Sequence, residues 1–413
     1  MTRGCVRVVL AALAAAGCGE SRSELPSIAA TVCPLAASPA FEESTAFQGG
    51  MFGTGVDGYP VFRIPAVVTT ASGVVLAFAE ARQSLADPGA GRIDVVMKQS
   101  RDCGRTWSRT AVLAENGEGD AHNPTALVVP HGDRASTVWL FFNRRPASPG
   151  GELDLPPGFG SEAASIWATT SDDDGTTWSA PRELTRDVKD EGWRVSSLGP
   201  GRAIVSAWGT ASAPRGRMIV PGWYTRDEVE GSWAMLSDDG GATWRRGGVP
   251  EPGTDESQVV ELVDGTVELD ARRAGTRRVQ SSSDGGETWG EPRDGLAMPP
   301  VMASVLRYAA RRAGDAHDVL LHSGILSNQP LGLRHGVRVW LSTDEGATWD
   351  HETPIEPGFS QYSVLTAFDD GSIGLLYESA GATGGSVGLD IRFARFDLDF
   401  LGAGELARGR SRR

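Results

Sequence analysis

Short apolar stretches that end in a turn recur along this chain. The segments Asp94-Val-Val-Met-Lys-Gln and Gly336-Val-Arg-Val-Trp-Leu are rich in strand-forming residues and run directly into Ser100 and Ser342. Both serines open the pattern Ser-x-Asp-x-Gly-x-Thr-Trp, in which Asp and Gly favour a tight turn and Trp supplies a large apolar side chain. This alternation predicts small antiparallel sheets, each with a hairpin turn formed by the motif.

The motif is an internal repeat. Its five copies begin at Ser100, Ser171, Ser237, Ser282 and Ser342, at intervals of 71, 66, 45 and 60 residues. A mean spacing of roughly 60 residues suits one four-stranded blade of a β-propeller with long loops. The roughly 355 residues between positions 46 and 400 then correspond to about six blades. We expect the motifs themselves to be structural turns that take no part in catalysis.

The composition agrees with this fold class. The chain has 413 residues, of which 40% are hydrophobic, 53 are glycine and 24 are proline, so it can bury a large core but contains many turns. We therefore predict an all-β protein, a six-bladed β-propeller with four-stranded antiparallel blades over residues 46–402. Residues 403–413 are rich in arginine and are expected to form a flexible tail.

The N-terminus has the pattern of an export signal. A short basic segment is followed by an apolar run from Val8 to Ala16, too short to span a bilayer, and then by Gly17-Cys18. Residues 1–17 are therefore predicted to be a signal peptide, and Ala15-Ala-Gly-Cys18 resembles a bacterial lipobox. The chain is expected to be exported as an outer-membrane or cell-surface lipoprotein. Ordinary cleavage, giving a periplasmic or secreted protein, is the alternative. Residues 18–45 are expected to be a tether.

Charge and cysteine content narrow the classes of partner. Fifty-three acidic and 39 basic residues give a formal charge of −14, which argues against nucleic acid or an anionic membrane surface as the main partner. With Cys5 in the signal and Cys18 at the lipobox, Cys33 and Cys103 remain as a candidate disulfide pair. The six histidines form no metal-binding motif, so neither a metal nor another cofactor is expected.

The repeats and three arginine contexts resemble the bacterial sialidases with Asp-box (BNR) repeats. The segment Phe-Arg63-Ile-Pro resembles a motif of that family, Glu256 precedes Arg272 by 16 residues as in the family, and Arg334 stands eight residues before the Asp-box Ser342. The resemblance implies that Arg63, Arg272 and Arg334 bind the carboxylate of sialic acid. A planar guanidinium suits this task because it can hold a carboxylate through two parallel hydrogen bonds.

The same resemblance implies a tyrosine nucleophile. Tyr362 in Phe-Ser-Gln-Tyr-Ser is the candidate, with Glu256 as the base that activates it and Glu378 as the carboxylate that orients Arg63. A neutral tyrosine suits this substrate because a carboxylate nucleophile would be repelled by the carboxylate of sialic acid, and sialidases are the tyrosine exception among glycosidases.

The acid/base group is expected in a loop. Arg82 is followed after five residues by Asp87, a spacing that resembles the family, so Asp87 is our candidate for protonating the leaving oxygen and Arg82 for a pocket residue. Asp94 is the alternative acid. Asn123, in His122-Asn-Pro-Thr, stands where some members place an Asp near the substrate and is a further pocket candidate.

The resemblance covers nearly the whole mature chain and implies an exo-α-sialidase that cleaves terminal sialic acid with retention of configuration. Sialylated glycans are the expected partners, and we expect a monomer. Two alternatives stay open: a trans-sialidase or anhydrosialidase with the same residues, and a sialoglycan-binding propeller without catalysis. A binding protein would need the arginines but not Tyr362, Glu256 and Asp87 together, which favours an enzyme.

Overall fold

The structure is a computed structural model that describes residues 33–35, 38–49, 58–84, 91–131, 135–148, 154–328, 333–380 and 390–407. The predicted signal peptide, Cys18, the first part of the predicted tether, Asp87 and the chain after residue 407 lie outside the described residues. Within the described ranges, no helix has both the length and the apolar character needed to cross a membrane.

The described chain is all-β apart from three short helical turns, α1 (Thr185–Val188), η4 (Arg311–Ala313) and η5 (Gly404–Ala407). Its strands pair antiparallel in successive groups of four. The first group contains β2 (Val61–Thr69), β3 (Val75–Arg82), β4 (Ile93–Ser100) and β5 (Ala111–Ala114). The second contains β6 (Asp120–His131), β7 (Ala135–Arg145), β8 (Ser165–Ser171) and β9 (Arg182–Glu183).

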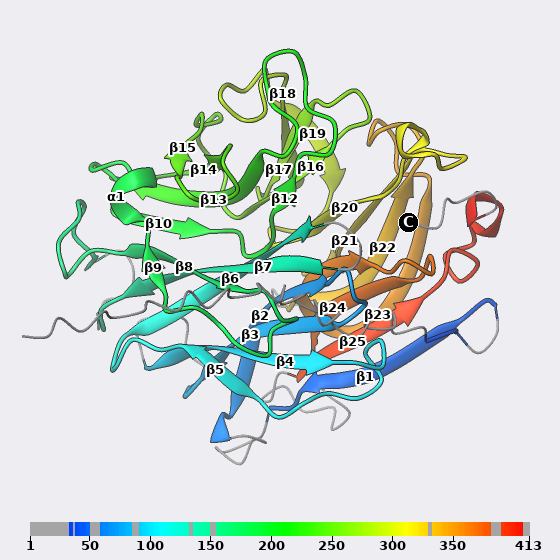
Figure 1. Ribbon diagram of the computed structural model, residues 1–413, viewed down its shortest axis with the longest axis horizontal. Coiled ribbons are helices and arrows are strands. Elements are labelled where there is room, and N and C mark those ends of the chain that lie inside the picture. The colour runs from blue at the N-terminus through cyan, green and yellow to red at the C-terminus, as the bar shows by residue number, and fades with distance from the viewer. Residues whose placement is uncertain are drawn as a thin grey trace, which may run out of the picture.

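The next groups follow the same plan. The third is β10 (Val195–Leu198), β13 (Met218–Arg226), β14 (Val229–Ser237) and β15 (Arg245–Arg246), beside which the short strands β11 (Gly201–Arg202) and β12 (Ile204–Val205) pair with β6 and β13. The fourth is β16 (Ser257–Glu261), β17 (Val267–Ala271), β18 (Thr276–Ser282) and β19 (Arg293–Ala297). In Figure 1 these groups follow one another around the molecule in chain order.

One long strand serves two groups. Strands β20 (Ser304–Ala309), β21 (Val319–Ser327) and β22 (His335–Ser342) pair in order with the first part of β23 (His351–Ala367). From Ser360 onward, β23 pairs instead with β24 (Ile373–Ser379), which pairs with β25 (Asp390–Phe396). The change of partner at Ser360 lies two residues before Tyr362.

The last group is completed from the other end of the chain. Strand β1 (Phe41–Phe47) pairs antiparallel with β25, with Phe41 opposite Phe396, and Figure 1 shows the two side by side. β1 thus begins five residues before the predicted start of the propeller at residue 46. Cys33 and Cys103 form a disulfide with Cα atoms 6.1 Å apart, which confirms the candidate pair. The segment before β1 is therefore tied to the first repeat motif as well.

All five repeat motifs form the same hydrogen-bonded turn. In the first copy, the Ser100 hydroxyl accepts the Gly104 N–H at 2.8 Å, and the Asp102 carboxylate accepts the Thr106 N–H at 2.8 Å and its hydroxyl at 2.6 Å. The other four copies repeat these three contacts. In the third copy, hydrogen bonds from Thr243 lower the pKa of Asp239 to about 2. The motifs are self-contained turns.

The turns lie at the opposite end of the strands from the candidate reactive residues. Register places Ser100, the start of the first motif, opposite Val75, which in turn pairs with Thr69 at the end of β2. Arg63 stands at the other end of β2, near its start. Arg63 and Thr69 are six residues apart on β2, so about 20 Å separates the first motif from Arg63.

The motif tryptophans are not equally buried, which gives a stability prediction. Trp244 is 5% exposed, with its ring centroid 5.2 Å from that of Phe141, whereas Trp178 is only partly buried against Phe78 at 5.9 Å. We expect Trp244→Ala to lower the free energy of unfolding by about 3–5 kcal/mol and Trp178→Ala to lower it by less, because less apolar surface becomes exposed. Urea denaturation of the two variants measures the difference, and equal losses would contradict this ranking.

Candidate active site

The centre of the candidate site is a buried tyrosine–glutamate pair. Tyr362 lies on β23 and Glu256 directly precedes β16, with exposures of 6% and 5%. The tyrosine hydroxyl donates to the carboxylate, at 2.8 Å from Oε1 and 2.7 Å from Oε2. Burial raises the pKa of Glu256, and burial together with the Glu256 charge raises the pKa of Tyr362 well above its usual value. The proton therefore rests on the tyrosine while the neighbouring base is placed to accept it.

Arg272 joins this pair because of a hairpin. Strands β16 and β17 are antiparallel with Ser257 opposite Ala271, so Glu256 and Arg272 are neighbours, and the Arg272 N–H donates to the Glu256 carbonyl at 2.8 Å. The Arg272 guanidinium also donates through Nη1 to Glu256 Oε2 at 2.8 Å and to the Tyr362 hydroxyl oxygen at 3.1 Å. The 16-residue spacing predicted from the sequence is thus the length of this hairpin.

Glu378 holds Arg63 in place. Its fully buried carboxylate accepts from Arg63 Nε at 3.2 Å and Nη2 at 3.3 Å, and also from the backbone N–H groups of Ile64 at 2.7 Å and Tyr362 at 3.3 Å. Ile64 has a φ of 55°, which is unusual for a β-branched residue and is typical of functional sites. This single carboxylate therefore holds both Arg63 and the backbone at Tyr362.

A glutamine links the first and third arginines. The side-chain carbonyl of Gln361 accepts from Arg63 Nη2 at 3.2 Å and from Arg334 Nη1 at 3.1 Å. The guanidinium carbons of Arg63 and Arg334 lie 5.4 Å and 5.6 Å from the centre of the Tyr362 ring. Together with Arg272, they surround Tyr362 with three positive charges, each of which favours a phenolate. Sequence reasoning missed Gln361, although it is adjacent to Tyr362.

Arg82 and Asn123 meet at a second buried carboxylate. Glu80, fully buried on β3, accepts from Arg82 Nε at 2.8 Å and from the Asn123 backbone N–H at 2.8 Å. The Asn123 side chain donates to the Ser197 hydroxyl at 2.8 Å, and its φ is 51°. The negative charge of Glu80 also helps to raise the pKa of Arg63. Glu80 therefore connects both predicted pocket residues to the arginine cluster, and sequence reasoning missed it too.

Of the two candidates for the acid, Asp94 and Asp87, the structure describes only Asp94. Asp94 is fully buried, and its carboxylate accepts from the Tyr59 hydroxyl at 2.6 Å and from Arg92 Nε at 2.9 Å. These two donors hold the carboxylate in a buried position, and Asp94 stays the alternative acid candidate. Asp87 lies outside the described residues. The flanking strands, however, bring Arg82 opposite Val61 and Ile93, at the end of the sheet where Arg63 lies.

Among the described residues, no group of three or more His, Cys, Asp and Glu side chains is placed to hold a metal ion. The arrangement that is present can bind a carboxylate through guanidinium groups, and it can deprotonate a tyrosine through Glu256. A buried tyrosine–glutamate pair beside an arginine cluster on an all-β fold is the arrangement that a tyrosine-dependent glycosidase of the sialidase type requires.

Comparison with known proteins agrees with that class. Residues 74–375 match the family model of the BNR repeat-like domain. A sialidase of Micromonospora viridifaciens is 33% identical over 97% of this chain and 60% of its own length, and one of Bacteroides fragilis is 31% identical over 81% and 62%. The chain belongs to the sialidase family with BNR repeats, and it spans about three fifths of these two relatives.

A solved structure shows the same fold. The Hadza microbial sialidase Hz136 superposes with a TM-score of 0.72 over 83% of this chain and 66% of its own, at 28% sequence identity. Its likeness supports the all-β fold described above, and it places the arginine cluster and the Tyr362–Glu256 pair on a scaffold shared with a sialidase.

Proposed function

We propose that this protein is an exo-α-sialidase that removes terminal sialic acid from glycans with retention of configuration, and that its strand groups form a six-bladed propeller. The observation that carries this proposal is the Tyr362 hydroxyl, 2.7 Å from a Glu256 oxygen and 3.1 Å from Arg272, between Arg63 and Arg334. A protein that only binds sialic acid has no need of a base within hydrogen-bonding distance of a buried tyrosine.

The geometry supports a two-step mechanism. Arg63, Arg272 and Arg334 bind the substrate carboxylate and place the anomeric carbon beside Tyr362. The tyrosine oxygen bonds to that carbon while its proton passes to Glu256, and the glycosidic bond breaks as Asp87 protonates the leaving oxygen. Asp87 then deprotonates a water that attacks the same carbon, and the tyrosine leaves with the proton from Glu256. Two inversions at one carbon give net retention.

The direct test is the product formed from sialyllactose. The purified protein should release free sialic acid and lactose without added metal. Inactivity on α2-3, α2-6 and α2-8 linkages between about pH 4 and pH 8 would contradict the proposal and favour a binding protein. Release of an anhydro sugar would indicate an anhydrosialidase in place of a hydrolase. Transfer of sialic acid to an added sugar acceptor would indicate a trans-sialidase.

The buried base gives a pH prediction. Glu256 must be ionised to accept the Tyr362 proton, and burial together with the neighbouring Asp255 charge raises the pKa of Glu256. We therefore expect kcat/KM to fall as the pH drops through a midpoint above 4.5, the ordinary value for this carboxyl. Asp255→Asn removes one negative charge and should move this midpoint to lower pH. A pH profile that is unchanged in Asp255→Asn would contradict the assignment of Glu256.

The role of Asp87 is tested by comparing two substrates whose leaving groups differ in their need for a proton. Only a poor leaving group needs a proton as the bond breaks, so Asp87→Ala should reduce hydrolysis of sialyllactose far more than hydrolysis of an activated aryl sialoside. The comparison of kcat/KM on the two substrates measures this difference. Equal losses on both would deny Asp87 the acid role.

A further inference from the structure

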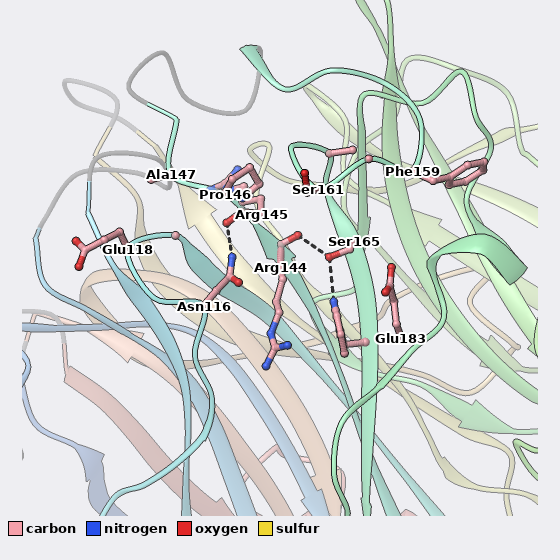
Figure 2. Close-up of a pocket in the computed structure, with 14 residues that line it drawn as sticks. Asn116, Glu118, Arg144, Arg145, Pro146, Ala147, Phe159, Ser161, Ser165 and Glu183 are labelled. Carbon is pink, nitrogen blue, oxygen red and sulfur yellow. Dashed lines mark hydrogen bonds between the residues drawn. The ribbon is translucent and has the colours of Figure 1, made fainter.

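A pocket of about 470 Å³ is lined by none of the residues used in the mechanism above. It is formed by the segment before β6, the end of β7, the loop before β8, and β9, as Figure 2 shows. Its volume falls within the usual range for small-molecule sites. The residues that give the pocket its chemistry are Glu118, Arg144, Phe159, Trp167 and Glu183.

The pocket is at the same end of the second strand group as the reactive residues. Arg145, at the end of β7, lies opposite Asp120, the first residue of β6. Asp120 is three residues before Asn123, which is about 10 Å along a strand. The pocket is therefore close enough to receive a part of the same glycan chain that extends away from Asn123 and the arginine cluster.

Arg144 carries the clearest sign of a missing partner. Its guanidinium carbon lies 4.4 Å from the centre of the Trp167 ring, and its buried Nε has no hydrogen-bond acceptor among the described residues. Burial lowers the pKa of Arg144, and the negative charges of Glu115 and Glu183 oppose this shift only in part. Arg144 as a whole is only partly buried and lines the pocket, so the exposed part of its stacked guanidinium can donate to a hydroxyl or carbonyl oxygen of a ligand.

The remaining lining groups narrow the ligand class. Two carboxylates, Glu118 and Glu183, line the pocket together with Arg144 and Arg145, and Arg145 is already paired with Asp120 at 2.8 Å. Carboxylates accept hydrogen bonds from hydroxyl groups but repel an anionic sugar. Phe159 and Trp167 offer apolar ring surface for the C–H face of a sugar. Donors, acceptors and aromatic rings without a surplus of positive charge suit a neutral saccharide better than a second sialic acid.

The walls of this pocket are held in place by buried contacts. Lys189, 4% exposed, donates to the carbonyl oxygens of Gly158 at 2.8 Å and Ala164 at 3.0 Å, and so ties both ends of the loop that carries Phe159. The Asn116 side chain donates to the Arg145 carbonyl at 2.7 Å. A ligand would therefore meet a preformed site with little ordering cost.

We propose that this pocket binds a neutral sugar residue of the glycan chain to which the sialic acid is attached. This inference rests on the proposed function, because it assigns the pocket to the chain that the reaction site shortens. It makes the neutral part of the glycan a determinant of substrate preference, through Arg144 and Glu183.

The kinetic test compares substrates with and without neutral sugars. In Arg144→Met and Glu183→Gln, the KM for a sialylated tetrasaccharide should rise about 10- to 150-fold, the loss expected for one hydrogen bond to a charged group. Values for an aryl sialoside, which has no neutral sugars, should stay unchanged. Glu162→Gln is the matched control, because Glu162 is exposed on the same loop but does not line the pocket. Equal changes on both substrates, or no change on either, would overturn the proposal.

A binding measurement separates this inference from the proposed function. Titration with the neutral tetrasaccharide lacto-N-tetraose should shift the NMR signal of the Trp167 indole N–H, which donates to the Ser165 hydroxyl at 2.9 Å. The shift should be lost in Glu183→Gln and kept in Glu162→Gln. A shift in a protein that cleaves neither substrate would support the pocket and overturn the proposed function. Absence of the shift in the unaltered protein would overturn the pocket assignment.

Discussion

Replacing Tyr362 with phenylalanine is expected to lower kcat by at least about a thousandfold while the fold survives. The change removes the attacking oxygen but keeps the ring that packs beside Arg63 and Arg334, 5.4 Å and 5.6 Å from their guanidinium carbons. Glu256 loses one hydrogen bond but keeps its ion pair with Arg272 at 2.8 Å. Steady-state turnover of sialyllactose and of an aryl sialoside measures the loss.

A matched control shows that the effect belongs to this hydroxyl. Tyr377 is fully buried on the neighbouring strand β24, and its hydroxyl donates to Glu43. Tyr377→Phe removes a buried hydroxyl outside the reactive cluster, so activity per folded molecule should persist. Circular dichroism and the melting temperature show whether both variants fold. Near-normal turnover in folded Tyr362→Phe would contradict the assignment of the nucleophile.

Replacing Arg334 with lysine is expected to reduce kcat/KM by about 10- to 100-fold, with most of the loss in KM. The positive charge remains, but the planar fork that binds a carboxylate through two hydrogen bonds is lost. In the protein, Gln361 and the Pro300 carbonyl accept from the two ends of this guanidinium at 3.1 Å and 3.2 Å, and so fix its plane. A lysine cannot use both contacts and still grip the substrate.

Arg338→Lys is the control for this substitution. Arg338 lies on β22, four residues further along the chain, and is paired with Glu352 away from Tyr362. This variant should keep its KM for sialyllactose, because its guanidinium does not belong to the arginine cluster. An unchanged KM in Arg334→Lys would contradict the assignment of Arg334 to carboxylate binding.

The parts of the site that the sequence predicted are those fixed by local strand geometry. Arg272 follows Glu256 by 16 residues because one hairpin turns back on itself, and Arg334 precedes Ser342 by eight because β22 fills the interval. Each spacing is a fixed number of residues and can be recognised in the sequence. Glu256, Arg272 and Arg334 could therefore be predicted with the help of their spacing, whereas Arg63 and Tyr362 were predicted because the residues around them resemble segments of the sialidase family.

Glu80 and Gln361 carry no comparable signal. Glu80 reaches Asn123 across two strand groups, and Gln361 bridges arginines that are far apart in the chain. A single buried carboxylate or amide inside a strand has no spacing that distinguishes it from a packing residue. Only the approach of β2, β3, β6 and β23 in space shows what these side chains bind.

The repeat motif also predicted only those strand groups that contain a copy of it. Each of the first five groups contains a repeat motif at a strand end, whereas the group of β23, β24, β25 and β1 has none. Its first strand in the chain, β1, comes from residues predicted in part as a tether, because pairing between the two ends of a chain leaves no local pattern. The alternation of more and less exposed residues in Phe41–Phe47 follows from the pairing of this strand with β25.

The most direct test of the account is covalent trapping with a 2,3-difluorosialic acid. Loss of fluoride from the anomeric carbon makes a bond to the nucleophile, whose phenol proton passes to Glu256, and the second fluorine slows the hydrolysis that follows. Peptide mass spectrometry of the inactivated protein should locate the added sugar on Tyr362, and Tyr362→Phe should remain unlabelled. A sugar attached to a different residue, or continued turnover without any attached sugar, would contradict catalysis through Tyr362.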